Sequence, residues 1–254
     1  VDYVLLDKGD QITGSTYGYR DNRTVGMDRE VARLISPENL YMRNGIQKLQ
    51  FNTIYQLMAA KLQEPETLTN ADSLLMIPDY FNFVLTGVKK SEYTNSTTGQ
   101  LVNVETKDWD WNLIETLGFP KTIFLPLTMP GTVVGSLKEE IAAEIGYQCR
   151  VLQIASHDTA SAVISVPTLM DDCLYISSGT WSLLGTEVKT PICTDESREK
   201  NFTNEGGYEY RYRFLKNIMG LWMIQSVRHE FDDAHSFGEI CEMAECEKEF
   251  PSRV

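Results

Sequence analysis

A short polar segment, Ser156-His157-Asp158-Thr159, directly follows the apolar run at residues 151–155 and opens a stretch of small residues. The apolar run predicts a buried strand, and the small residues from Thr159 onward predict a helix to about residue 165. Asp158 would then lie at the positive end of that helix, which favours its carboxylate form and brings backbone N–H groups close to a polar ligand. An aspartate at this position is also an ordinary helix N-cap, so both interpretations stay open.

A second candidate is Ser177-Ser178-Gly179-Thr180, which joins two short apolar runs at residues 174–176 and 181–184. This order predicts a β-hairpin whose glycine permits a tight turn, and whose hydroxyls and amides could approach phosphate oxygens. The same composition is common in turns without any ligand, as is that of Asn204-Glu205-Gly206-Gly207. The two candidates support each other because each is a small-residue turn at a strand end, one with an acid and one with a phosphate-sized cradle.

Familiar signatures of other enzyme classes are absent from the sequence. It contains no Gly-x-x-x-x-Gly-Lys-Ser/Thr loop, no Gly-x-Gly-x-x-Gly and no Gly-x-Ser-x-Gly, which argues against Walker-type NTPases, Rossmann dehydrogenases and serine hydrolases. The 5 cysteines form no Cys-x-x-Cys, and there are only 3 histidines, so no metal site is predicted from these residues.

Composition limits the partners. The 254 residues are 42% hydrophobic and 23% charged, which is typical of a folded globular protein. With 23 Lys+Arg against 36 Asp+Glu, the net charge of −13 disfavours nucleic acid and anionic membranes as partners. No run approaches the ~20 apolar residues of a membrane span, and no signal peptide opens the chain, so we expect a soluble cytoplasmic protein. The chain starts without Met, and we expect it to be an internal piece of a longer protein.

Hydrophobic periodicity predicts the elements that would position these turns. A β-hairpin is expected from residues 3–6 with the segment from residue 11 onward, and a strongly apolar helix over residues 214–227 with Asn217 and Gln225 on one face. A domain change is placed near residue 168, which divides the chain into residues 1–167 and 168–254. Further helices are predicted over residues 28–34, 52–62, 78–85, 112–117 and 137–145.

The sequence as a whole resembles the FGGY family of carbohydrate kinases, and within that family the branch that phosphorylates rhamnulose. The matching strings lie at residues 19–24, 45–53, 78–81, 85–87, 92–95, 156–162, 177–182, 204–207 and 215–222. His157 before the aspartate and Leu-Lys-Asn-Ile-Met-Gly-Leu-Trp at 215–222 are the features typical of that branch. The resemblance implies an α/β, actin/hexokinase-like (ribonuclease H-like) kinase fold with two domains around a cleft, here incomplete at both ends. Residues 1–167 would be the rear of the sugar-binding domain and 168–254 the start of the nucleotide-binding domain.

The resemblance also implies an activity, namely ATP-dependent phosphorylation of the 1-hydroxyl of L-rhamnulose with Mg²⁺. Asp158 resembles the family's proton acceptor, His157 and Thr159 resemble the adjacent sugar-contacting residues, and Asn217 resembles a further sugar contact. Thr180 and Gln225 resemble nucleotide-contacting positions. The expected partners are therefore a small sugar and ATP, and the sequence does not indicate an oligomeric state.

The chain departs from the family pattern in extent. The family's first phosphate loop, with its Asp-x-Gly, and its adenosine site have no counterpart among these residues. Other readings therefore stay open: a non-catalytic or truncated sugar-binding module of the same fold, a kinase for a different ketose or polyol, or an actin-like or chaperone-like ATPase.

Overall fold

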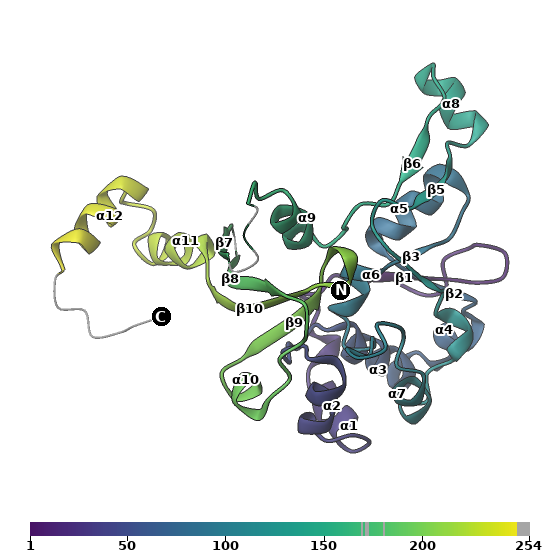
Figure 1. The fold of residues 1–254 in the computed structure, drawn as a ribbon, viewed down its shortest axis with the longest axis horizontal. Coiled ribbons are helices and arrows are strands. Elements are labelled where there is room, and N and C mark those ends of the chain that lie inside the picture. The colour runs from purple at the N-terminus through teal and green to yellow at the C-terminus, as the bar shows by residue number, and fades with distance from the viewer. Residues whose placement is uncertain (169, 171–172, 180, 248–254) are drawn as a thin grey trace.

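The computed structural model describes residues 1–168, 170, 173–179 and 181–247. It is a mixed α/β structure in which helices surround short strands in the first half, and a larger antiparallel sheet forms much of the second half (Figure 1). We call residues 1–129 the N-terminal body, residues 133–152 the arm, and the four strands between residues 174 and 219 the C-terminal sheet. None of the helices in the described ranges is both long and apolar enough to cross a membrane.

The first strand pairs with a distant partner. β1 (Tyr3–Leu6) runs antiparallel to β2 (Ser73–Met76), with Tyr3 opposite Met76. The predicted hairpin with the segment from residue 11 is therefore wrong in its main pairing, since only a single bridge, Leu6 to Ile12, joins the two. All four residues of β1 are buried, so the strand pairs inside the body with another buried strand and not with an exposed segment.

Most of the helices of the body form where the periodicity predicts them. The expected helices at 28–34, 52–62, 78–85 and 112–117 are confirmed, with ends shifted by a few residues. Helix α5 ends at Gly87, whose left-handed φ of 74° suits a residue without a Cβ. The helices are α1 (Met27–Ala32), α2 (Pro37–Asn44), α3 (Thr53–Gln63), α4 (Pro65–Asn70), α5 (Ile77–Thr86), α6 (Tyr93–Thr97) and α7 (Trp111–Thr116). Strands β3 (Ser91–Glu92) and β4 (Leu127–Thr128) form a short parallel pair.

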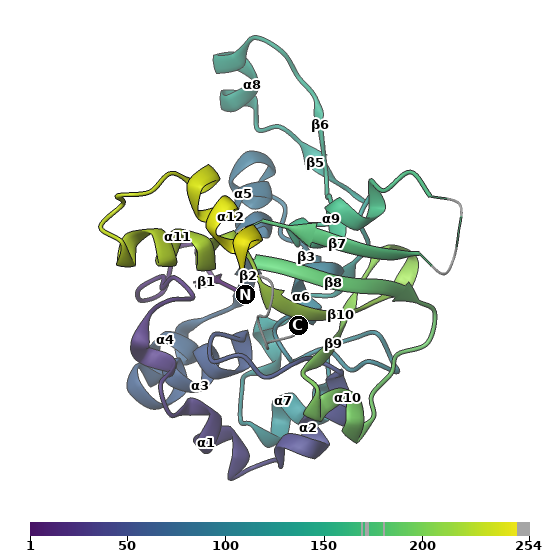
Figure 2. The same ribbon diagram turned by 90° about the vertical axis from the view of Figure 1, so that its left-hand side faces the viewer.

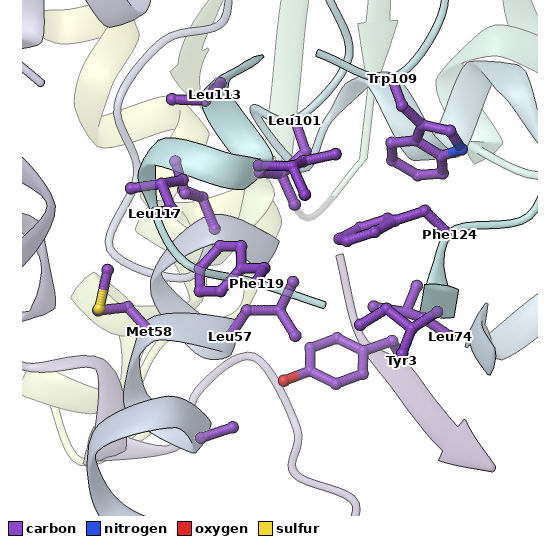
Figure 3. Close-up of a cluster of buried hydrophobic side chains, with 14 of the residues drawn as sticks. Tyr3, Leu57, Met58, Leu74, Leu101, Trp109, Leu113, Leu117, Phe119 and Phe124 are labelled. Atoms are coloured by element: carbon purple, nitrogen blue, oxygen red, sulfur yellow. The ribbon is translucent and has the colours of Figure 1, made fainter. Parts of the chain in front are cut away.

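A continuous hydrophobic core holds the body together (Figure 3). Leu57 and Met58 of α3 share this cluster with Leu113 of α7 and with Leu117, which directly follows α7, and the ring centroid of Trp109 lies 4.9 Å from that of Phe124. Full burial of each such side chain contributes roughly 1.5–3 kcal/mol to folding. This core fixes the body against which the polar segments described below are placed.

The arm projects away from the rest of the molecule (Figures 1 and 2). It consists of β5 (Val133–Ser136), α8 (Glu139–Ile145) and β6 (Arg150–Leu152), with β5 and β6 antiparallel. The helix predicted at 137–145 is confirmed, but the buried strand predicted over 151–155 is wrong. β6 ends at Leu152 and is largely exposed because the two-stranded arm has no second layer above it.

The C-terminal sheet contains four antiparallel strands in the order β7-β8-β10-β9. They are β7 (Leu174–Ser178), β8 (Trp181–Val188), β9 (Phe202–Gly206) and β10 (Tyr212–Met219). The predicted hairpin of β7 and β8 is confirmed, with Ser178 opposite Ser182 across the turn. Helix α9 (Asp158–Ile164) leads into this sheet from the arm, and α10 (Asp195–Glu199) lies between β8 and β9.

The long helix predicted over residues 214–227 is wrong. Its first half is strand β10, Gly220 separates the two halves, and only the second half is helical, as α11 (Leu221–Glu230), which is followed by α12 (Phe237–Cys246). Residues 212–219 form a strand because they pair on one side with β8 and on the other with β9, and this tertiary pairing outweighs the local helical periodicity. Asn217 and Gln225 consequently do not share the face of one helix.

Candidate active site

A cleft of about 710 Å³ opens between the N-terminal body and the C-terminal sheet. The body contributes the loop around residues 46–52 and the start of α5. Opposite them lie the first turn of α9, the turn after β7, and inward-facing residues of β9 and β10. The lining includes Tyr19, Gln47, Phe51, Asn95, Ser156, His157, Asp158, Thr159, Ser177, Ser178, Gly179, Trp181, Thr203, Glu205 and Asn217.

The structure brings together most of the residues that the sequence singled out. His157, Asp158, Thr159 and Asn217 all line the cleft, although Asn217 comes from strand β10 and not from a helix. Gln225 lies on α11 with an exposed side chain and is not among the residues that line the cleft. Thr180 lies outside the described residues, while its neighbours Ser177, Ser178 and Gly179 line the cleft.

Asp158 occupies the first position of α9, and its side chain is 95% exposed. One carboxylate oxygen, Oδ1, accepts hydrogen bonds from the Thr159 backbone N–H at 2.6 Å and from the Thr159 hydroxyl at 3.3 Å. The residue at the N-cap position is His157, which makes no side-chain capping bond, so Asp158 is not the N-cap itself. The result is an exposed carboxylate at the edge of the cleft, with hydrogen bonds to one of its two oxygens.

The segment before His157 is held by a buried glutamate of the body. Glu92 is fully buried and accepts hydrogen bonds from the Ser156 backbone N–H at 3.2 Å and from the Ser156 hydroxyl at 2.8 Å. It also accepts from Thr94 N–H at 2.7 Å, Thr94 hydroxyl at 2.7 Å and Asn95 N–H at 2.9 Å. One side chain thereby connects the start of α6 to the turn that carries Asp158.

A second buried carboxylate supports Glu92. Asp79 accepts from the Glu92 backbone N–H at 3.0 Å and from the Gln153 side-chain amide at 3.0 Å. Burial raises the pKa of Asp79 to about 7, because only neutral donors surround it and the nearby Glu92 opposes its charge. Asp79 and Glu92 lie in segments that carry the family resemblance, but local sequence did not predict that they would pair, because they belong to separate elements.

Glu205 lies behind His157 on strand β9. Its Oε2 is 3.2 Å from His157 Nδ1 and 3.2 Å from Nη2 of the fully buried Arg213. Burial alone would raise the pKa of Glu205, but the nearby His157 and Arg213 lower it to about 2, so the carboxylate is ionised at neutral pH. Sequence reasoning treated residues 204–207 only as a turn and did not identify Glu205.

Asn217 links the sheet to the body across the cleft. Its side-chain amide donates to Gln47 Oε1 at 3.0 Å, and both residues line the cleft. Tyr19 and Phe51 form an edge-to-face aromatic pair with ring centroids 5.2 Å apart in the same wall. The cleft therefore offers polar groups for hydroxyls and aromatic surface for C–H groups.

Metal-ligating side chains do not gather in the described part of the chain. Within residues 1–168, 170, 173–179 and 181–247, no group of three or more His, Cys, Asp or Glu side chains could hold a metal ion. Asp158 contributes an exposed carboxylate to the lining of the cleft, but a single carboxylate does not make a metal site.

Comparison with protein families identifies two adjoining matches. Residues 1–165 match the N-terminal domain of the FGGY family of carbohydrate kinases, and residues 174–254 match the C-terminal domain of the same family. A rhamnulokinase of Oceanobacillus iheyensis is 53% identical over 247 residues, which are 97% of this chain and 52% of the relative. A rhamnulokinase of Halalkalibacterium halodurans is 51% identical over 96% of this chain and 52% of its own length. The chain thus spans about half the length of these relatives.

Solved structures share the fold at much lower identity. A xylulose kinase from Lactobacillus acidophilus superposes with a TM-score of 0.85 at 18% identity, over 97% of this chain and 50% of that one. A glycerol kinase from Plasmodium falciparum, solved with ADP, gives 0.79 at 14% identity over 97% of this chain and 50% of its own. The described chain has the fold of the corresponding half of these kinases.

Proposed function

This chain belongs to the FGGY family of carbohydrate kinases, and from that premise we propose that the full-length protein that carries it phosphorylates a ketose at the cleft. ATP is the phosphoryl donor, and L-rhamnulose, at its 1-hydroxyl, is the substrate. Support for this substrate comes from relatives named rhamnulokinase that are 53% and 51% identical over nearly the whole chain.

The observation that carries the proposal is the exposed Asp158 carboxylate beside His157 in a cleft between two parts of the chain. Asp158 orients the attacking hydroxyl and accepts its proton as general base. Phosphoryl transfer passes through a loose transition state that needs little help from a strong base, so an ordinary exposed aspartate suffices. His157, Thr159 and Asn217 contact the sugar hydroxyls, and closure of the cleft would exclude water.

Fewer candidate residues are available for contacts with the nucleotide than for contacts with the sugar. We propose that the turn after β7, including Thr180, contacts ATP phosphates, and that Gln225 on α11 contacts the nucleotide. The division into a sugar-binding part, residues 1–167, and a nucleotide-binding part, residues 168–254, is part of the same proposal. Mg²⁺ accompanies ATP in phosphoryl transfer, but the described residues form no cluster of three or more side chains that could hold it.

A sugar panel tests the proposal. ADP formation by the full-length protein is measured with L-rhamnulose, L-fuculose, D-xylulose and glycerol at equal concentrations, and the phosphorylated carbon is identified by NMR. We expect the highest kcat/KM with L-rhamnulose and a 1-phosphate product. Equal rates with L-fuculose or D-xylulose would reject the substrate while keeping the kinase class, and sugar binding without ADP formation would indicate a non-catalytic module.

A further inference from the structure

A buried ion cluster lies directly behind the cleft. Glu205 of β9 and Arg213 of β10 are register partners in adjacent strands, and Nη2 of Arg213 is 3.2 Å from Glu205 Oε2. The same Nη2 donates to the Gly206 backbone carbonyl at 3.1 Å. Arg213 is fully buried, and its Nε and Nη1 atoms have no hydrogen-bond partner among the described residues.

Stability alone does not account for this cluster. A buried ion pair loses the hydration of both charges, and apolar side chains of similar volume often stabilise a fold equally well or better. Here two of the three guanidinium nitrogens also lack partners among the described residues, which adds to the cost. A charged pair at this place is therefore better explained by what Glu205 contacts on its other side.

That contact is the imidazole of His157. Nδ1 of His157 is 3.2 Å from Glu205 Oε2, and neither atom makes an aligned hydrogen bond elsewhere among the described residues. A small rotation of the ring would align the Nδ1–H with the carboxylate, and leaving both buried polar atoms unpaired would be unfavourable. An ionised carboxylate can only accept, so the pairing requires the proton on Nδ1.

We propose that Glu205, held in place by Arg213, is a positioning residue that fixes His157 with its proton on Nδ1. The other ring nitrogen, Nε2, lies 3.5 Å from Asp158 Oδ1 and is then an acceptor for a substrate hydroxyl. His157 and Asp158 thereby present two neighbouring acceptors, which suits a substrate with two neighbouring hydroxyl donors. This inference rests on the proposed function of the same cleft.

The tautomer of His157 can be measured without any activity. The sequence has 3 histidines, so ¹⁵N-histidine labelling gives few signals, and the pair that disappears in His157→Gln belongs to His157. At pH 8 in the full-length protein without substrate, we expect Nδ1 to be protonated and Nε2 to be unprotonated. A protonated Nε2, alone or together with Nδ1, would overturn the inference.

The kinetic test replaces Glu205 and Arg213 together by uncharged residues, because changing only one of them would leave the other as an unpaired buried charge. Glu205→Leu combined with Arg213→Met removes both charges together, and the melting temperature reports whether the fold survives. We expect kcat/KM for the sugar to fall by about tenfold or more, with KM for ATP unchanged and the fixed tautomer lost in the ¹⁵N spectrum. Sugar kinetics within twofold of the unmutated protein would contradict the positioning role, as would a tautomer that stays fixed.

Two further variants separate positioning from general damage. Glu205→Gln combined with Arg213→Met also removes both charges but keeps an oxygen that can accept from Nδ1–H, so we expect sugar kinetics nearer to the unmutated protein than those of the Glu205→Leu, Arg213→Met variant. Arg43→Met combined with Asp110→Asn removes both charges of a different arginine–carboxylate pair, Arg43 with Asp110 at 2.5 Å, which lies outside the cleft lining, and should leave kcat/KM within twofold. If the unmutated protein phosphorylates no sugar, the proposed function fails, while the ¹⁵N spectrum still decides the tautomer.

Discussion

Glu92 and Glu205 are two buried carboxylates that contact successive residues of the same turn, and they are partnered in opposite ways. Glu92, in the body, accepts five hydrogen bonds from neutral donors, two of them from Ser156. Glu205, in the C-terminal sheet, faces a histidine and a buried arginine, and its Oε2 has no aligned hydrogen bond among the described residues. The first side chain belongs to a network of neutral hydrogen-bond donors, whereas the second belongs to an ion cluster that positions the imidazole of His157.

This difference indicates that the two carboxylates have different roles at the cleft. A network whose members are all paired is rigid and keeps Ser156 in one place relative to the body. The ion cluster of Glu205 and Arg213 acts instead on the next residue, where its charge holds the proton of the His157 imidazole on Nδ1. Asp158, which follows, is exposed, so the turn passes within three residues from a hydrogen-bonded residue to a charge-paired one and then to an exposed one.

The largest expected effect is at the exposed end of this turn. Asp158→Asn in the full-length protein should lower turnover by roughly two to four decades, because the general base is lost. The exposed asparagine can still accept from Thr159 N–H, so the melting temperature should not change. Turnover within a few-fold of the unmutated protein would reject Asp158 as the base.

The buried Asp79, which supports Glu92, should make the stability of the protein depend on pH. Burial raises the pKa of Asp79 to about 7, so the native state keeps a proton that the unfolded state releases near pH 4. The stabilisation from this proton is complete below about pH 4 and is lost as pH rises through 7, a change on the order of 4 kcal/mol.

Urea unfolding from pH 4 to pH 8 measures this change, with Asp79→Asn as the comparison. The variant cannot release the proton, so its free energy of unfolding should fall less over this range than that of the unmutated protein. Parallel curves for the two proteins would show that Asp79 titrates normally.

Glu92→Gln tests whether the network around Glu92 depends on all of its hydrogen bonds. The amide NH₂ that replaces one carboxylate oxygen cannot accept, so we expect a loss of ~3 kcal/mol in the free energy of unfolding. Glu115→Gln is the matched control, since the exposed Glu115 side chain pairs with Lys121 at the surface, and this variant should show no measurable change in stability. Equal stability of the two variants would remove the distinction between Glu92 and an ordinary surface glutamate.

A smaller effect is expected where the body meets the sheet. Gly45 has φ of 69°, and a Cβ there would lie 2.9 Å from Asn204 Cβ and 2.9 Å from Cys193 Sγ. Gly45→Ala should cost ~2 kcal/mol, of which ~1 kcal/mol is left-handed strain. Gly26→Ala isolates that strain, because Gly26 has φ of 82° with nothing within 4 Å of the added Cβ. If both variants unfold at the same urea concentration, the close approach of Asn204 and Cys193 to Gly45 does not contribute to the loss of stability.

Local sequence predicted much of the fold because helical periodicity and turn residues act over short distances. The helices near residues 52–62 and 78–85 and the hairpin of β7 and β8 follow from such signals. The pairing of β1 with β2 and the strand character of Tyr212–Met219 did not follow, since the first depends on a strand far along the chain and the second on pairing with strands on both sides.

The candidate site divides in the same way. His157, Asp158 and Thr159 are adjacent in sequence and were found together, and Asn217 came only through resemblance. Glu205, Gln47 and Glu92 were missed because their significance arises only when β9, the 46–52 loop and β3 are folded against the turn. No periodic pattern marks a residue whose partner is more than forty positions away.

The arm offers a practical handle on the molecule. Helix α8 lies at the far end of its two-stranded ribbon (Figure 2), and directly after this helix Tyr147 is 62% exposed and a side chain added at Gly146 would meet nothing within 4 Å. Antibody epitopes, affinity tags or a fluorophore inserted there should leave the body and the cleft undisturbed. The same isolation makes the tip the place where a protease should first nick the native protein, which gives a simple gel assay for correctly folded material.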